Sequence, residues 1–268
     1  MNDATPADPS LHAQRKGTGA PLLLVHGLGS NAESWAPIMD RLAEQRSVIA
    51  VDLPGFGRTP PLAGPVTIAT LTDAVEDFIA TEGLGNVSTV GSSMGARMVL
   101  ELARRGVGGD TVALDPGGFW SPWEQKVFGA SVAASVKLVR LLQPMLPALT
   151  GNAVGRTALL AQFSARPWAL APEVVLQELR SFDASPSLDE ALRSLVKGPL
   201  QAGAPAGASP GRITIGWGRR DRVTLPRQAD RAASLFPDAT IRWFEHAGHF
   251  PYWDRPSETA EVILAHTS

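Results

Sequence analysis

Two adjacent serines lie between two glycines in the stretch "TVGSSMGARMVLELARR", residues 89–105. The second serine, Ser93, is the central residue of the pattern G-x-S-x-G. This pattern is typical of a strand that turns abruptly into a helix and holds its serine in a strained conformation. Gly91 and Gly95 would remove Cβ atoms that collide at such a turn. We therefore expect Ser93 to be a nucleophile, with the backbone N–H of Met94 facing a developing oxyanion.

Short apolar runs alternate with helical patterns around this serine. The runs that predict strands are Pro21–Gly27, Ser47–Gly55, Val87–Ser92, Thr111–Gly118 and Arg212–Gly218. The helical patterns are Trp35–Glu44, Thr67–Glu82 and Met94–Arg105. Strands that are apolar on both faces favour a parallel sheet covered by helices on both sides. The chain is thus predicted to be an α/β protein with a doubly wound, mostly parallel sheet.

This alternation stops after Phe119. From Trp120 to about Leu200 the pattern is helical throughout, and a linker rich in small residues, Leu200–Gly211, follows it. The next strand-like run comes after the linker. The sequence therefore predicts a helical insert of roughly 80 residues between two strands of one sheet.

Four segments occur in an order and at a spacing that resemble the α/β-hydrolase fold family, in its capped, microbial branch. They are "HGLGS" (His26–Ser30), "DLPGFGRT" (Asp52–Thr59), "GSSMG" (Gly91–Gly95) and "GRRDRV…AGHFPYW" (Gly218–Trp253). The resemblance covers all of the chain except the insert. It implies an α/β-hydrolase core of residues 1–119 and 206–268, with a helical cap of residues 120–205.

A serine hydroxyl needs a base to take its proton and an acid to orient that base. The resemblance assigns the base to His249 in "HAGHF"; the neighbouring His246 is the competitor, interpreted as structural or at the surface. It assigns the acid to Asp221, because Gly218–Val223 has the form G-x-x-D-x-V. Asp115, which also directly follows a predicted strand, is the alternative acid.

The resemblance also assigns roles to the glycine-rich loop. His26 would shape this loop without transferring protons, and Leu28 would donate the second N–H of an oxyanion hole beside Met94. Asp52 in "DLPGFGRT" is interpreted as a structural turn residue that bonds loop backbone.

The insert supplies an apolar set of side chains: Trp123, Phe128, Met145, Leu146, Phe163, Trp168 and Phe182. As a set they predict an apolar chamber over Ser93, which is how small-molecule sites are commonly lined.

The activity expected from these residues is that of a serine hydrolase acting on a carboxylic ester, with a lactone as a variant of the same chemistry. The alternative is hydrolysis of a carbon–carbon bond in a vinylogous diketone acid, since "DPGGF" (Asp115–Phe119) and Trp253 resemble those hydrolases. No cap arginine can be assigned to their substrate-carboxylate contact, for which Arg156 and Arg166 are the nearest candidates. A ligand-binding protein that lost turnover is a third hypothesis, disfavoured because every catalytic element is retained.

Composition limits the other classes of function. The formal net charge of -2 gives no support to nucleic-acid or anionic-membrane binding, and the absence of cysteine excludes disulfides and thiolate chemistry. We expect no cofactor and no metal, a small-molecule substrate as partner, and a monomer or homodimer. The polar N-terminus predicts no secretion signal, residues 131–150 predict an amphipathic helix rather than a membrane span, and a cytoplasmic location is the default.

Overall fold

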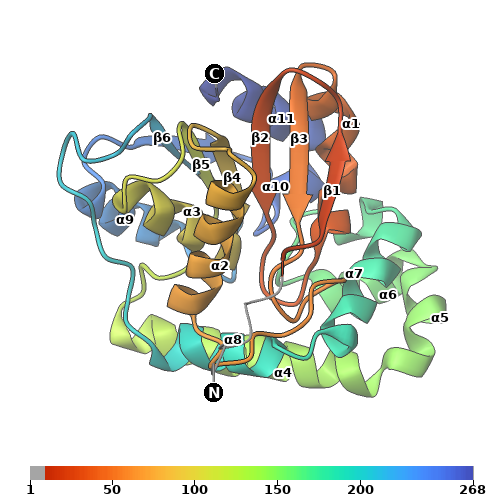
Figure 1. The fold of residues 1–268 in the computed structure, drawn as a ribbon. Coiled ribbons are helices and arrows are strands. Elements are labelled where there is room, and N and C mark those ends of the chain that lie inside the picture. The colour runs from red at the N-terminus through yellow and green to blue at the C-terminus, as the bar shows by residue number, and fades with distance from the viewer. Residues whose placement is uncertain (1–9, 268) are drawn as a thin grey trace, which may run out of the picture.

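A seven-stranded sheet runs through the molecule, with helices on both faces (Figure 1). The computed structural model describes residues 10–267. The sheet has the order β1-β3-β2-β4-β5-β6-β7, in which β1 is antiparallel to β3 and the other pairs are parallel. The strands are β1 (Ala13–Lys16), β2 (Ala20–Val25), β3 (Arg46–Val51), β4 (Ser88–Ser92), β5 (Thr111–Leu114), β6 (Ile213–Gly218) and β7 (Thr240–Phe244). The predicted doubly wound, mostly parallel sheet is confirmed.

Alternate side chains of the strands form two apolar clusters, one on each face of the sheet. Leu23 and Val25 of β2 pack on one face, whereas Leu22 and Leu24 pack on the other. The first face is covered by α2 (Ile68–Thr81), α3 (Met94–Arg104) and α9 (Ala229–Leu235). The second face is covered by α1 (Ala36–Ala43), α10 (Pro251–Asp254) and α11 (Pro256–His266). Burial on both faces explains why the central strands read as continuous apolar runs.

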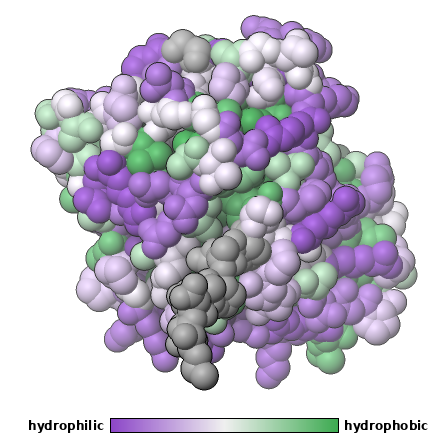
Figure 2. All heavy atoms as spheres, viewed as in Figure 1, coloured by the Kyte–Doolittle hydropathy of each residue, from purple (hydrophilic) through white to green (hydrophobic). Residues whose placement is uncertain are grey.

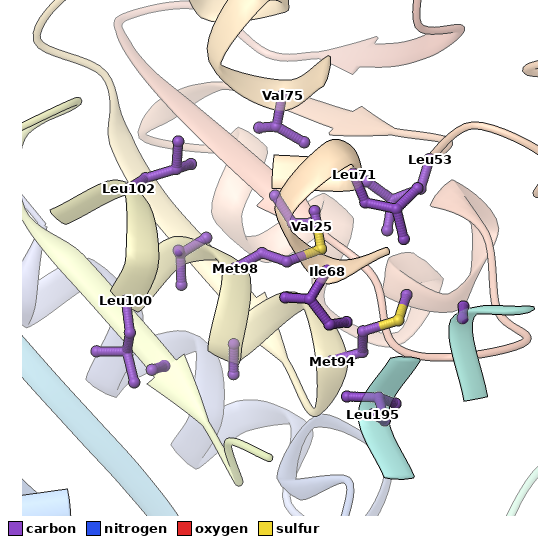
Figure 3. Close-up of a cluster of buried hydrophobic side chains, with 14 of the residues drawn as sticks. Val25, Leu53, Ile68, Leu71, Val75, Met94, Met98, Leu100, Leu102 and Leu195 are labelled. Atoms are coloured by element: carbon purple, nitrogen blue, oxygen red, sulfur yellow. The ribbon is translucent and has the colours of Figure 1, made fainter. Parts of the chain in front are cut away.

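Helix α3 carries an apolar stripe toward the first face. Met94 and Met98 lie one turn apart and pack with Val25 and Ile68 in the cluster shown in Figure 3. Leu195, from a helix of the insert, joins the same cluster beside Met94. Helix α3 is therefore anchored to the sheet, to α2 and to the insert at once.

The chain between β5 and β6 forms the helices of the insert, which lie together at the end of the sheet where the parallel strands terminate (Figure 1). They are α4 (Pro122–Leu141), α5 (Leu146–Thr150), α6 (Ala153–Leu160), α7 (Pro172–Ala184) and α8 (Leu188–Lys197), with short 3-10 turns between some of them. α7 and α8 begin after Ala171 and Ser187, and both carry acidic residues in their first turns. These negative charges stabilise each helix, because they lie near the positive end of its dipole.

Two edge strands of the sheet were not predicted from the sequence. β1 has the sequence AQRK and β7 the sequence TIRWF, and neither is a continuous apolar run because only part of an edge strand is buried. One face of the molecule is mainly polar, with small scattered apolar patches (Figure 2). The prediction about a secretion signal concerns an N-terminus whose residues 1–9 lie outside the described part.

Within residues 10–267 no single helix has the length and apolarity of a membrane span. α4 together with the segment Gln143–Thr150 meets those two criteria only as a pair bent by 65°.

Candidate active site

Ser93 occupies a strained turn between β4 and α3. Its φ and ψ are 55° and -110°, a conformation that non-glycine residues rarely adopt. A Cβ atom at Gly91 would lie 2.2 Å from the carbonyl oxygen of Gly95, and one at Gly95 would lie 2.2 Å from that of Val25. The two glycines are thus required because the turn closes on itself and on β2, and not because side chains there would strike Ser93.

His249 contacts Ser93 with one ring nitrogen and Asp221 with the other. Its Nε2 lies 2.8 Å from Ser93 Oγ, and its Nδ1 lies 2.9 Å from Asp221 Oδ2. Because a carboxylate only accepts, Nδ1 carries the proton and Nε2 is free to accept the serine O–H. The histidine is buried, and its backbone N–H donates to the carbonyl of Phe163 at 2.8 Å. The geometry can therefore pass a proton from the serine hydroxyl to the imidazole.

Asp221 lies in the turn after β6 and is the better satisfied of the two candidate acids. Its Oδ1 accepts the backbone N–H of Val223 at 2.7 Å and of Thr224 at 3.1 Å, and its Oδ2 accepts the Thr224 hydroxyl at 2.6 Å. Each bond satisfies an acceptor position of the Asp221 side chain and fixes its orientation. Sequence reasoning missed Thr224, although a threonine three residues after the acid is a signal that could have found it. Asp115, the alternative, accepts the backbone N–H of Gly218 instead.

The glycine-rich loop after β2 passes directly against Ser93. A Cβ atom at Gly27 would lie 3.3 Å from the Cβ of Ser93. His26 is fully buried; its Nε2 accepts the N–H of Leu53 at 3.0 Å, so its Nδ1 donates to the Gly27 carbonyl at 2.7 Å. Burial lowers the pKa of His26 to about 4. A neutral ring that is fully engaged shapes the loop, as the sequence predicted.

The remaining sequence candidates are Asp52, His246, Leu28 and Met94. Asp52 accepts the backbone N–H of Ala32 at 2.7 Å and of Arg58 at 2.9 Å, so it is a loop-bonding residue as expected. His246, the competing base, is exposed at the surface. Leu28 is half-buried in the glycine-rich loop, and Met94 is the first residue of α3.

Part of the insert contacts the loops that hold the serine and the histidine. A Cβ atom at Gly29 would lie about 3 Å from the side chains of Phe182 and Leu188, so these two cover the glycine-rich loop. The ring of Phe163 stacks on that of Phe250, with centroids 6.2 Å apart. We call the loops that follow β2, β4, β6 and β7, with Ser93, Asp221 and His249, the rim of the sheet. The insert covers this rim through aromatic and aliphatic side chains.

Asp254 ties the insert to the histidine loop, and sequence reasoning missed it. Its carboxylate accepts the backbone N–H of Gly248 at 2.7 Å and of Ala165 at 2.8 Å, and also the Ser164 hydroxyl. A buried aspartate just after an aromatic run is a weak signal, since nothing in the sequence tells which backbone it will meet.

The predicted apolar set is wrong for three of its members. Trp123, Met145 and Trp168 are 62%, 55% and 53% exposed on the outside of the insert. Phe128 and Leu146 are buried within the two core clusters. Helical periodicity indicates which face of a helix is buried, but it does not indicate whether that face packs on the site or on another helix. The predicted set of pocket-lining residues was therefore too large.

The two arginines considered as carboxylate anchors have other positions. Arg156 is buried and donates to the backbone carbonyls of Thr150 and Trp168 at 2.7 and 2.8 Å. The side chain of Arg166 is exposed. Arg156 therefore stabilises turns of the insert.

One group of His and acidic residues in the described chain is close enough to hold a metal ion. Ligand atoms of Asp115, Asp221 and His249 all lie within 4.8 Å of one another. The His249 nitrogen that faces Asp221 carries a proton, so its lone pair is not free to ligate. The arrangement fits a hydrogen-bonded acid–base pair better than a ligand set.

Comparisons with known proteins agree with this geometry. A family model described as "Alpha/beta hydrolase family" matches residues 22–262. The dihydrolipoyllysine-residue acetyltransferase component of the acetoin cleaving system of Cupriavidus necator is 27% identical over 266 residues, which cover 94% of this chain and 65% of that protein. The chain therefore spans less than two thirds of that relative's length.

Two solved structures are similar over almost the whole chain. A thermophilic esterase from Thermogutta terrifontis has a TM-score of 0.76 at 21% identity, covering 99% of this chain and 97% of that one. A meta-cleavage product hydrolase from Pseudomonas fluorescens IP01 has a TM-score of 0.70 at 18% identity, covering 96% and 93%. At these identities the likeness shows the shared fold.

Proposed function

Because the chain belongs to the α/β-hydrolase family, we propose that it is a serine hydrolase that cleaves a carboxylic ester of a mainly apolar small molecule. A lactone, as a cyclic ester, falls within the same chemistry. The observation that carries this proposal is the line of contacts from Ser93 Oγ to His249 Nε2, 2.8 Å, and from His249 Nδ1 to Asp221 Oδ2, 2.9 Å.

The reaction begins when Ser93 Oγ attacks the ester carbonyl and His249 Nε2 takes the serine proton. Asp221 stabilises the imidazolium and keeps its orientation. The backbone N–H groups of Leu28 and Met94 bind the oxyanion of the tetrahedral intermediate. Collapse of this intermediate breaks the C–O bond, and His249 returns the proton to the leaving alcohol.

Water completes the cycle by the same route. His249 takes a proton from the water, the hydroxyl attacks the acyl-enzyme, and the second tetrahedral intermediate releases the carboxylic acid. The proton returns to Ser93 Oγ. Each half-reaction moves one proton through one imidazole, so no cofactor is required.

We propose that residues 120–205 act as the cap that selects the substrate. Its apolar contacts with the glycine-rich loop come from Phe182 and Leu188. Two polar residues of α7 also meet this loop, since Ser181 donates to the Gly29 carbonyl and Glu178 lies beside Ser30. The guanidinium of Arg156 is held by backbone carbonyls of the insert, and the side chain of Arg166 is exposed. These positions favour neutral, hydrophobic acyl groups.

The alternative activity is hydrolysis of a carbon–carbon bond in a vinylogous diketone acid. It is favoured by "DPGGF" at Asp115–Phe119 and by Trp253 four residues after His249. In this chain Gly118 has a φ of 103° and packs on Arg97. The ring of Phe119 packs on that of Trp217, and the ring centroids of Trp253 and Phe250 lie 4.4 Å apart. Since these residues have packing roles, the ester reaction is the better supported of the two.

The test is a paired assay with covalent labelling. Purified protein is offered short p-nitrophenyl esters, a charged ester of equal size, and a dienol-diketone acid. We expect turnover of the neutral esters, and labelling by a fluorophosphonate that maps to Ser93. A strong preference for the charged acid would favour carbon–carbon cleavage, and absence of labelling would reject the serine mechanism.

A further inference from the structure

A cavity lies where α2 and α3 of the core meet α8 of the insert (Figure 1). Its volume is about 680 Å³, which is within the range of small-molecule sites. Its walls are the start of α2, one side of α3, most of α8 and residues 198–202, which follow α8. Ser93, Asp221 and His249 are not among the residues that line it. The proposed reaction therefore does not account for this cavity.

Arg97, on α3, is the buried charged residue of the cavity wall. It is only 4% exposed, because residues 198–202 and the loop after β5 lie against it. Its Nη2 donates to the carbonyl of Pro199 at 2.5 Å, and a Cβ atom at Gly118 would lie 3.2 Å from its Cδ. Its Nη1 has no hydrogen-bond partner within residues 10–267. A buried N–H group without an acceptor costs free energy, so Arg97 has a donor left for a ligand.

The positive charge of Arg97 is not matched by a carboxylate of its own helix. Glu101, one turn further along α3, accepts from Arg104 at 2.7 Å and from Arg105 at 3.0 Å instead. Burial lowers the pKa of Arg97 to about 10, so its guanidinium is still charged at neutral pH. An anionic group of a ligand would therefore satisfy both the unpaired donor and the unpaired charge.

Two further cations and a helix terminus make the cavity positive. Arg193 and Lys197 of α8 line it, are exposed, and form no ion pair with another residue of the described chain. The first turn of α2 lies on the same wall, and this end of a helix is the positive end of its dipole. Glu190 is exposed and accepts the backbone N–H of Val66 at 3.2 Å. The lining has five basic residues against two acidic ones, which favours an anion.

The remaining wall of the cavity is apolar. Val66 and Ile68 at the start of α2 are buried, and Ile68 packs in the same cluster as Met94 and Leu195 (Figure 3). Leu200 also lines the cavity but is 46% exposed. An apolar group that covered Leu200 would remove its surface from water, which is favourable. The cavity thus combines an apolar wall with a buried cation.

We propose that this cavity is a second, non-catalytic binding site, which takes a small molecule with an apolar body and one anionic head group. The head group accepts the Nη1–H of Arg97 and lies near Arg193 and Lys197. The body packs on Ile68 and Leu200. Carboxylates and phosphates share this chemistry. Because the bound molecule contacts both the core and the insert, it stabilises their junction. The site does not depend on the serine mechanism.

Calorimetric titration with decanoate tests the site, with decyl phosphate as the second head group and 1-decanol as the neutral molecule of equal chain length. We expect at least one of the two anions to bind, and decanol to bind about tenfold more weakly or less. The ratio of the two anion affinities tells whether the site prefers a carboxylate or a phosphate. Equal affinity for decanol, or absence of binding by both anions, would overturn the proposal.

Substitutions on the wall test where the anion binds. Arg97→Gln should weaken its binding about tenfold, since a charged donor is lost. Ala69→Glu adds a carboxylate at an exposed wall position in the first turn of α2, where an acidic residue favours the helix. It should weaken binding about threefold or more. Ala69→Gln and Arg180→Gln are the controls and should bind like the parent protein, because Arg180 is an exposed arginine of α7 outside the cavity.

Ala69→Glu keeps the proposal testable if Arg97→Gln does not fold. Unchanged affinity for the anion in either variant, when folded by circular dichroism, would overturn the proposal. Titration of the parent protein after fluorophosphonate labelling separates the cavity from the site at Ser93. Retained binding supports a separate site, whereas loss of binding would place the anion at Ser93 and overturn it. A protein that does not label rejects the serine mechanism alone, and the variants still decide on the cavity because they do not require Ser93 to react.

Discussion

The rim of the sheet and the helical insert hold the candidate site by different kinds of contact. At the rim, backbone meets backbone: a Cβ atom at Gly95 would strike the carbonyl of Val25, and one at Gly218 would lie 2.1 Å from the carbonyl of Gly248. Between α4 and α8 of the insert the neighbour is a side chain instead: a Cβ atom at Gly129 would lie 2.8 Å from the side chain of Val196, which can move.

This difference separates reaction from specificity. Backbone contacts fix the relative positions of the serine, the acid and the histidine, because neither peptide groups nor strands can shift without breaking the sheet. Side-chain contacts between insert and rim can be rearranged by substitution at modest cost.

Ser93→Ala tests the rim most severely. If Ser93 is the nucleophile, kcat for a neutral ester should fall by about 10⁶-fold, since only binding and the oxyanion donors remain. Circular dichroism should be unchanged. The matched control is Ser92→Ala, because Ser92 is fully buried and adjacent. A dead control beside an active Ser93→Ala would place the nucleophile one residue earlier.

Asp221→Asn should have the next largest effect. The amide cannot hold the imidazole in the useful tautomer, so kcat should fall by up to about 10⁴-fold with little change in stability. Asp115→Asn is the comparison, and its effect should be far smaller because Asp221 and not Asp115 contacts His249. The reverse ranking in steady-state kinetics, with both variants folded, would move the acid to Asp115.

Gly95→Ala tests whether the rim is sterically fixed. The new Cβ would lie 2.2 Å from one backbone carbonyl and 2.5 Å from another, those of Val25 and His26. We expect a loss of about 4 kcal/mol or more in the free energy of unfolding. Gly85→Ala is the control, since a Cβ there has nothing within 4 Å, and its stability should be unchanged or slightly higher. Urea denaturation measures both, and equal midpoints would show that the turn is pliable.

Sequence reasoning found the rim because steric rules there are local. Gly91, Ser93 and Gly95 form a pattern whose geometry requires those residue types, and the loops that follow the strands carry His249 and Asp221. The central strands were readable because burial on both faces makes them continuously apolar. β1 was not, because its sequence AQRK is polar and its pairing with β3 joins residues far apart in the chain.

The helical structure of the insert was predicted, but the contacts of its side chains were not. Trp123 and Trp168 are residue types that commonly line pockets, yet both are exposed on the outside, whereas Phe182 contacts the glycine-rich loop. Which face of each helix meets the rim depends on how five helices pack together, and that is a non-local property. Asp254 was missed for the same reason, since its partners lie about 90 residues away in the chain.

The smallest expected effect concerns Glu178, on α7 of the insert, and it is a change in the free energy of unfolding with pH. Glu178 is buried beside the Ser30 hydroxyl of the glycine-rich loop, and burial raises its pKa from 4.5 to about 7. Between these values the folded state binds more protons than the unfolded state, so the free energy of unfolding falls as the pH rises. Above about pH 7 the loss is complete and amounts to about 1–3 kcal/mol.

Glu178→Gln removes this titration. The variant should unfold at a higher temperature than the parent protein near pH 8, and the difference should shrink toward about pH 5, where the parent carboxyl is protonated. Glu173→Gln is the control, because Glu173 lies in the first turn of the same helix but is exposed. A constant difference in unfolding temperature between the parent protein and Glu178→Gln across this range would show that the carboxyl is not buried between α7 and the glycine-rich loop. As the pH rises, Glu178 becomes charged at the contact between α7 and the glycine-rich loop. If the insert can loosen from this loop while the sheet stays folded, the parent protein should lose its preference among esters at a lower pH than it loses its sheet.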